Sequence, residues 1–133
     1  MAFVVDSSMT VAWMIRRQAN RDSRHALERT RREAVHVPSL WPLEFLNTLL
    51  MLERRALLAA HEVQGILARV NRLQMHVETA PADNGALLRL ARDTRLSIYD
   101  ASYLELAQRR GLPLATRDRA MQLAARRLGI ALA

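Results

Sequence analysis

The chain of 133 residues contains no cysteine and no lysine, only four glycines, and few aromatic side chains. The lack of cysteine excludes disulfides, zinc–thiolate sites and thiol catalysis, and it is compatible with the reducing cytoplasm, where we expect the protein to reside. The four glycines form no phosphate-binding loop, so nucleotide binding of the Rossmann or P-loop type is unsupported. The four histidines show no spacing typical of metal ligands.

Long hydrophobic runs are also missing from the chain. The most apolar region, residues 40–52, is interrupted by Glu44, Asn47 and Thr48, so we expect no membrane span. The first residues lack a basic segment followed by a long apolar one, so we expect no signal peptide. Hydrophobic residues make up 50% of the chain but aromatic residues only 5%, which predicts an aliphatic core.

Positive charge is abundant and comes from one residue type. All 20 basic residues are arginine, and the formal net charge is +7. Because a guanidinium can donate two hydrogen bonds to one phosphate, this excess indicates a nucleic-acid or acidic protein partner. A genome whose base composition favours arginine codons would give the same excess of arginine. The charge alone therefore does not decide between a binding function and codon usage.

Short apolar runs alternate with amphipathic segments, which is typical of an α/β domain with a parallel sheet, and the length fits a single domain, residues 1–133. Strands are predicted at residues 3–5, 35–37, 75–78, 112–116 and 130–132. Helices are predicted at residues 7–15, 23–33, 40–55, 59–73, 83–94, in a segment that ends at Gly111, and at 120–128. We expect a three-layer α/β/α fold with about five short strands between the helices.

Four carboxylates stand at positions that favour a shared site. Asp6 and Asp118 each follow an apolar strand at its carboxyl end, where ligands bind in open α/β sheets. Glu44 and Asp100 lie on apolar helix faces, and Asp100 is predicted to point inward while Glu105 points outward. If the four converge, their repulsion would raise their pKa values or require a cation. Oxygen ligands alone suit Mg²⁺ or Mn²⁺, and such clusters hydrolyse phosphodiesters by activating water and stabilising the leaving oxygen.

Each carboxylate also has a simpler interpretation. An aspartate after a strand is often a helix cap or turn residue, which would account for Asp6 and Asp118 separately. Glu44 would extend its carboxylate to solvent or pair with an arginine, and Asp100 would cap the start of its helix. Because the four residues are spread across the whole chain, their spacing leaves the convergence open.

The segments that carry the four carboxylates resemble, in their order and separation, those of the PIN-domain ribonucleases. They are Phe-Val-Val-Asp-Ser-Ser at residues 3–8, Pro-Ser-Leu-Trp-Pro-Leu-Glu-Phe-Leu-Asn-Thr-Leu at 38–49, Tyr-Asp-Ala-Ser-Tyr-Leu-Glu-Leu-Ala at 99–107 and Leu-Ala-Thr-Arg-Asp at 114–118. In length and layout the chain is similar to the VapC-like toxins of type II toxin–antitoxin pairs. The resemblance covers essentially all of its residues.

The resemblance implies a catalytic, metal-binding group made of Asp6, Glu44, Asp100 and Asp118. Ser8 and Thr116 match hydroxyl residues that are expected to support these carboxylates or to contact phosphate. Asn47 matches a polar residue one turn after the glutamate and is expected to support Glu44. Some members of the family carry another acidic residue just past the last aspartate, but residues 119–121 are not acidic here, so a site with five carboxylates is not expected.

By the same resemblance, the protein is expected to be a Mg²⁺-dependent (or Mn²⁺-dependent) endoribonuclease toxin. Water would be the nucleophile, tRNA or rRNA the substrate, and a cognate antitoxin would occlude the site of a homodimer. One alternative is a PIN-fold module that binds RNA or protein without catalysis, which the complete set of four carboxylates argues against. The other is a PIN-type nuclease outside a toxin–antitoxin pair, and a small upstream gene for a DNA-binding antitoxin would separate it from the toxin.

Overall fold

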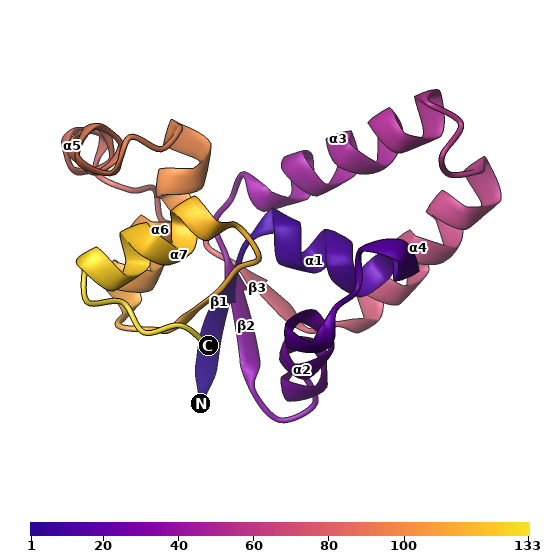
Figure 1. The fold of residues 1–133 in the computed structure, drawn as a ribbon, viewed down its shortest axis with the longest axis horizontal. Coiled ribbons are helices and arrows are strands. Elements are labelled where there is room, and N and C mark those ends of the chain that lie inside the picture. The colour runs from indigo at the N-terminus through magenta and orange to yellow at the C-terminus, as the bar shows by residue number, and fades with distance from the viewer.

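The computed structural model describes the backbone of residues 1–133 and every side chain except that of Arg16. Four parallel strands form one sheet in the order β3-β2-β1-β4, with helices on both of its faces (Figure 1). The strands are β1 (Ala2–Val5), β2 (Ala34–Val37), β3 (Met75–Val77) and β4 (Leu114–Ala115). The helices are α1 (Ser7–Met14), the 3-10 helix η1 (Arg16–Gln18), α2 (Arg21–Arg29), α3 (Trp41–Arg54), α4 (Ala60–Arg72), α5 (Asn84–Thr94), α6 (Ile98–Arg110) and α7 (Arg119–Arg127). The predicted three-layer α/β/α fold is confirmed.

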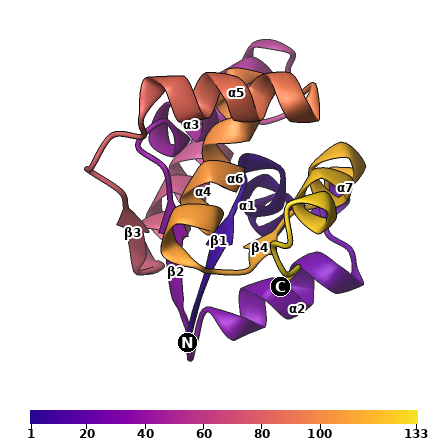
Figure 2. The same cartoon turned by 90° about the vertical axis from the view of Figure 1, so that its left-hand side faces the viewer.

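β1 lies at the centre of the fold. Its residues Phe3, Val4 and Val5 are each 0% exposed, as expected for a strand that is covered on both faces of a parallel sheet. Figure 1 shows α1 to α4 on one side of the sheet and α5 to α7 on the other. β1 pairs with β2 along one edge and with β4 along the other, so the carboxyl ends of β1 and β4 lie side by side (Figure 2).

At the β4 edge of the sheet, the strands are shorter than the sequence predicts. The strand predicted at 112–116 is limited to Leu114–Ala115, since Pro113 has no N–H to donate to a neighbouring strand. The strand predicted at 130–132 forms only an isolated parallel bridge, between Leu114 and Leu132. The sheet therefore has four strands and this bridge, close to the five that were expected.

The second helix begins earlier than predicted. α2 starts at Arg21 because Asn20 and Ser23 form a reciprocal capping box. The Asn20 side chain accepts a 2.7 Å hydrogen bond from the N–H of Ser23, and the Ser23 hydroxyl accepts one of 2.9 Å from the N–H of Asn20. The helix ends at Arg29, so the last predicted turn is not α-helical, and the Arg29 guanidinium pairs with Glu33 just beyond the helix.

α3 is apolar on two faces. Its inner face packs Trp41, Phe45 and Leu49 into the core. Its outer face exposes four large hydrophobic side chains, which are Leu43, Leu46, Leu50 and Met51. Hydrophobic residues on both faces do not make α3 a membrane helix: within the described part of the chain, no helix is both long and apolar enough to span a bilayer.

Candidate functional site

Asp6 follows β1 directly, at the carboxyl edge of the sheet, and it is only 4% exposed. Its Oδ1 caps α1 by accepting a 3.0 Å hydrogen bond from the N–H of Met9, and it also accepts one of 2.7 Å from the Ser8 hydroxyl. Its Oδ2 accepts a hydrogen bond from the hydroxyl of Thr116. Asp6 is therefore both a helix cap and a buried carboxylate at the edge where α/β sheets bind ligands.

Burial raises the pKa of Asp6 to about 6, because the charged carboxylate loses its hydration. The hydrogen bonds from Thr116, Ser8 and the N–H of Met9 favour the charged form and oppose this rise without cancelling it. The negative charge of Asp100 adds a smaller rise, so Asp100 lies close enough to act on Asp6 electrostatically.

Thr116 connects two of the aspartates. Its hydroxyl donates to Asp6 and accepts a 3.0 Å hydrogen bond from the N–H of Asp118. Asp118 in turn caps α7, where its Oδ1 accepts a 3.0 Å hydrogen bond from the N–H of Met121. Asp118 is exposed whereas Thr116 is buried. Thr116 thus links the buried carboxylate of Asp6 to the backbone of Asp118, whose own carboxylate is exposed.

Glu44 and Asp100 approach the same edge from helices on opposite sides of the sheet (Figure 1). Glu44 lies in the first turn of α3, and its Oε1 accepts a 2.6 Å hydrogen bond from the hydroxyl of Tyr103 on α6. Asp100 lies one turn before Tyr103, in the first turn of α6. The pKa of Tyr103 is raised first by burial and then by Glu44, and the negative charges of Asp6 and Asp100 raise it further. The Tyr103 hydroxyl therefore contacts Glu44 directly, and the negative charges of Asp6 and Asp100 act on it electrostatically.

The pKa of Asp100 reflects the charge of a second aspartate in this set of four carboxylates. It is raised above its ordinary value, first by partial burial and then by the negative charge of Asp118, while a hydrogen bond with the Ser97 side chain lowers it. Asp100 therefore interacts with Asp118 as well as with Asp6. These interactions and the Glu44–Tyr103 hydrogen bond link all four carboxylates that the sequence predicts, either to one another or through Tyr103.

No ion pair with an arginine compensates any of the four carboxylates among the described side chains. A group of carboxylates, one of them buried and with a raised pKa, fits the preference of Mg²⁺ and Mn²⁺ for oxygen donors. The carboxylates are not drawn into a closed metal site, since the described residues contain no group of three or more histidine or acidic side chains arranged to hold one ion. The oxygen donors therefore fit a divalent cation by their chemistry, whereas the described residues do not form a closed site for one.

The structure also shows the surroundings of two further polar residues for which the sequence carries a prediction, Asn47 and Glu105. Asn47, expected to support Glu44, is exposed, and its amide contacts the sulfur of Met51 at 3.7 Å. Glu105, expected to point outward, forms an ion pair of 2.7 Å with Arg109, and its side chain is only 13% exposed. Glu105 is therefore partly covered on the surface of α6, and the role of Asn47 stays a prediction.

Tyr103 and Arg117 lie at the site although no sequence motif predicts a role for them. A tyrosine in the buried stripe that follows Asp100 needs a partner for its hydroxyl, and that requirement is the signal the sequence offers. Arg117 lies between Thr116 and Asp118, and its N–H donates to the Ser8 hydroxyl at 3.2 Å. Its Nε is buried and has no hydrogen-bond partner among the described residues.

A protein-family model described as "PIN domain" matches residues 3–127, a range that contains all four carboxylates. The chain belongs to the PIN-domain family. The match confirms the family that the four sequence motifs indicate, and the PIN domain extends over nearly the whole chain.

Several solved structures share this PIN fold. VapBC2 from Rickettsia felis, bound to a DNA fragment from their promoter, is similar with a TM-score of 0.70 and 13% identity, over 100% of this chain and 98% of that chain. PAE2754 from Pyrobaculum aerophilum gives a TM-score of 0.68 and 23% identity, over 93% and 79%. A toxin-antitoxin complex from Klebsiella pneumoniae gives 0.56 and 18%, over 87% and 86%. At these identities the likeness concerns the fold alone, and no curated protein matches the sequence.

Proposed function

We propose that this protein is a divalent-metal-dependent endoribonuclease and the toxin of a toxin–antitoxin pair that acts in the cytoplasm. The observation that carries the proposal is the group of carboxylates at the carboxyl edge of a PIN-domain sheet, none of which pairs with an arginine whose side chain the structure describes. The toxin role is supported by fold similarity to VapBC2 and to a toxin-antitoxin complex. The net charge of +7 suits a substrate whose phosphates carry one negative charge each.

The residues that would hold the cation are Asp6, Glu44, Asp100 and Asp118. When bound, Mg²⁺ or Mn²⁺ supplies the positive charge that activates water and stabilises the leaving oxygen of a phosphodiester. The hydroxyls of Ser8 and Thr116 hold the Asp6 carboxylate in one orientation, so that its oxygens are placed before substrate arrives. Water is the nucleophile, and no covalent intermediate with the protein forms.

The experiment that tests this function is the cleavage of bulk cellular RNA, and of defined tRNAs and rRNA, by the purified protein with Mg²⁺, Mn²⁺ or EDTA. We expect cleavage that needs the metal and disappears in the Asp6→Asn variant. Asp93→Asn removes a carboxylate from the exposed surface of α5 and should leave cleavage unchanged. Cleavage that continues in EDTA or in Asp6→Asn would contradict the metal site, and inactivity on every RNA would favour a binding module.

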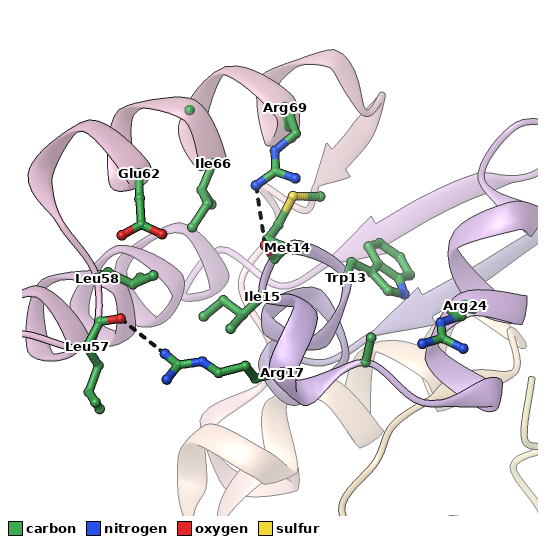
Figure 3. A pocket seen from close by; sticks show the side chains of 12 residues that line it. Trp13, Met14, Ile15, Arg17, Arg24, Leu57, Leu58, Glu62, Ile66 and Arg69 are labelled. Carbon is green, nitrogen blue, oxygen red and sulfur yellow. Dashed lines mark hydrogen bonds between the residues drawn. The ribbon is translucent and has the colours of Figure 1, made fainter.

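The antitoxin partner would occupy a groove of about 860 Å³ beside α1 and α4 (Figure 3). Its apolar lining includes Trp13, Ile15, Leu58 and Ile66. Among the described lining residues, three arginines and one glutamate are charged, and they are Arg17, Arg24, Arg69 and Glu62. Apolar surface with excess positive charge fits a peptide segment that carries both hydrophobic and acidic side chains.

Two of the groove arginines are already held in position (Figure 3). Arg17 donates a 3.1 Å hydrogen bond to the carbonyl of Leu57, and Arg69 donates one of 3.3 Å to the carbonyl of Met14. We expect the double variant Arg17→Glu, Arg69→Glu to bind the product of an adjacent antitoxin gene at least about 10-fold more weakly, with RNA cleavage unchanged. The control is Arg92→Glu, on the exposed surface of α5. It changes the net charge by as much as each of the two groove substitutions does alone.

The outer face of α3 supports the homodimer. Leu43, Leu46 and Leu50 are spaced by three and four residues, so they form one stripe along the helix, and they are 73%, 45% and 40% exposed. A continuous apolar stripe on the surface is typical of a protein–protein interface. A second copy of the chain would bury this stripe against its own.

A further inference from the structure

Tyr103 is a core residue that contacts Glu44, one of the four carboxylates of the proposed metal site. Its side chain is 1% exposed, and its hydroxyl donates a 2.6 Å hydrogen bond to Oε1 of Glu44. A length of 2.6 Å is in the range of hydrogen bonds from a hydroxyl to a charged carboxylate. Tyr103 is on α6 and Glu44 on α3, so this bond joins helices from opposite sides of the sheet (Figure 1).

We propose that Tyr103 is a positioning residue of the metal site, whose hydroxyl holds one oxygen of Glu44 so that the other oxygen is available to a divalent cation. This inference rests on the proposed function. In the part of the chain that the structure describes, Tyr103 is the one donor that reaches the Glu44 carboxylate. Without it, a half-buried glutamate in the first turn of a helix has several rotamers available.

The chemistry of the donor supports a positioning role. An arginine partner would neutralise Glu44 and compete with a cation for its oxygens, and the chain has 20 arginines from which such a partner could come. A phenolic hydroxyl orients the carboxylate and leaves its negative charge in place. Residues that hydrogen-bond a metal ligand in this way commonly tune both its geometry and its affinity for the metal.

The test is the binding of Mn²⁺ to the purified protein without RNA, followed by electron paramagnetic resonance or calorimetry. Tyr103→Phe keeps the ring in the core and removes only the hydroxyl. We expect it to raise the Kd for Mn²⁺ about 10-fold or more and to lower kcat for RNA cleavage by a similar factor, with the KM for RNA unchanged. Tyr99→Phe is the matched control on the same helix, since Tyr99 is 63% exposed, and it should bind Mn²⁺ like the wild type.

A second measurement separates positioning from packing. In a Glu44→Gln background, Tyr103→Phe should cause no further loss of Mn²⁺ affinity, because its effect passes through the carboxylate. An equal loss in both backgrounds, or wild-type affinity in Tyr103→Phe, would overturn the positioning role and leave the proposed function standing. If the wild type itself bound no Mn²⁺, the proposed metal site would fail and the inference with it.

Discussion

Replacing Asp6 by asparagine should stabilise the protein at neutral pH in metal-free buffer, although it removes a residue of the proposed active site. The pKa of Asp6 is raised from 3.8 to about 6, mainly by burial. A rise of this size corresponds to about 3 kcal/mol at neutral pH, because each pKa unit is worth about 1.4 kcal/mol. The carboxylate in the unfolded chain ionises near pH 4 and the folded one near pH 6, so the stability that Asp6 provides at low pH is lost as pH rises through this window.

The free energy of unfolding should therefore be compared for wild type and Asp6→Asn from pH 4 to pH 8 in EDTA. Urea titration followed by tryptophan fluorescence suits this protein, since Trp13 and Trp41 are both buried. We expect the stability of the variant relative to wild type to rise by about 2 kcal/mol between pH 4 and pH 7 and then to level off. The difference between the two proteins cancels the contributions of the other titrating groups.

The control is Asp93→Asn, which removes an exposed carboxylate and should change stability by less than about 0.5 kcal/mol at every pH. Adding Mg²⁺ or Mn²⁺ at about 1,000 times the Kd should reverse the order at pH 7, because only the wild type gains from binding, by about 4 kcal/mol. A stability difference between Asp6→Asn and wild type that stays constant from pH 4 to pH 7 would refute the claim that burial raises the pKa of Asp6.

Three further variants test the site and the surface of α3. Asp100→Asn should abolish RNA cleavage while the protein is as stable as wild type or more so in metal-free buffer, since it relieves repulsion within the group; a large loss of stability would instead indicate a structural role. Thr116→Val removes a buried hydroxyl that donates to Asp6 and accepts from Asp118, so urea titration should show a loss of about 1–3 kcal/mol, and the step in stability near pH 6 should move to higher pH. Leu50→Asp changes a side chain that is 40% exposed, so it should convert the dimer to a folded monomer in sedimentation analysis, and a wild type that is already monomeric would contradict the proposed interface.

The order of the elements could be predicted because the signals for it are local. The apolar run Phe3–Val5 is buried completely, and Gly111 ends α6 with a positive φ of 64°, as a glycine after a helix is expected to. The early start of α2 also had a local signal, since Asn20 and Ser23 have the spacing of a capping box. The reduced β4 edge did not, because the pairing of residues 130–132 depends on where the last helix returns to the sheet.

The candidate site depends on contacts between distant parts of the chain. The hydrogen bond from Thr116 to Asp6 joins residues 110 positions apart, and that from Tyr103 to Glu44 joins residues 59 apart. Local reasoning identifies Asp6 as a helix cap, which it is, but it cannot show that the same side chain interacts with Asp100. The order of the four motifs, compared with a known family, supplies this information. Neither the local sequence signals nor the order of the motifs identifies Tyr103, because a tyrosine in an apolar stripe has the pattern of a core residue.

The most direct test of the account is a crystal structure of the protein with Mn²⁺, in which the anomalous signal of the metal gives its position independently of the protein atoms. We expect a peak at the carboxyl edge of β1 and β4, bound by oxygens of two or more of the four carboxylates, and no peak in Asp6→Asn crystals treated in the same way. A wild-type crystal in which Mn²⁺ binds elsewhere, while these carboxylates keep their hydrogen bonds and bind no ion, would contradict the central claim that they form the metal site of a nuclease.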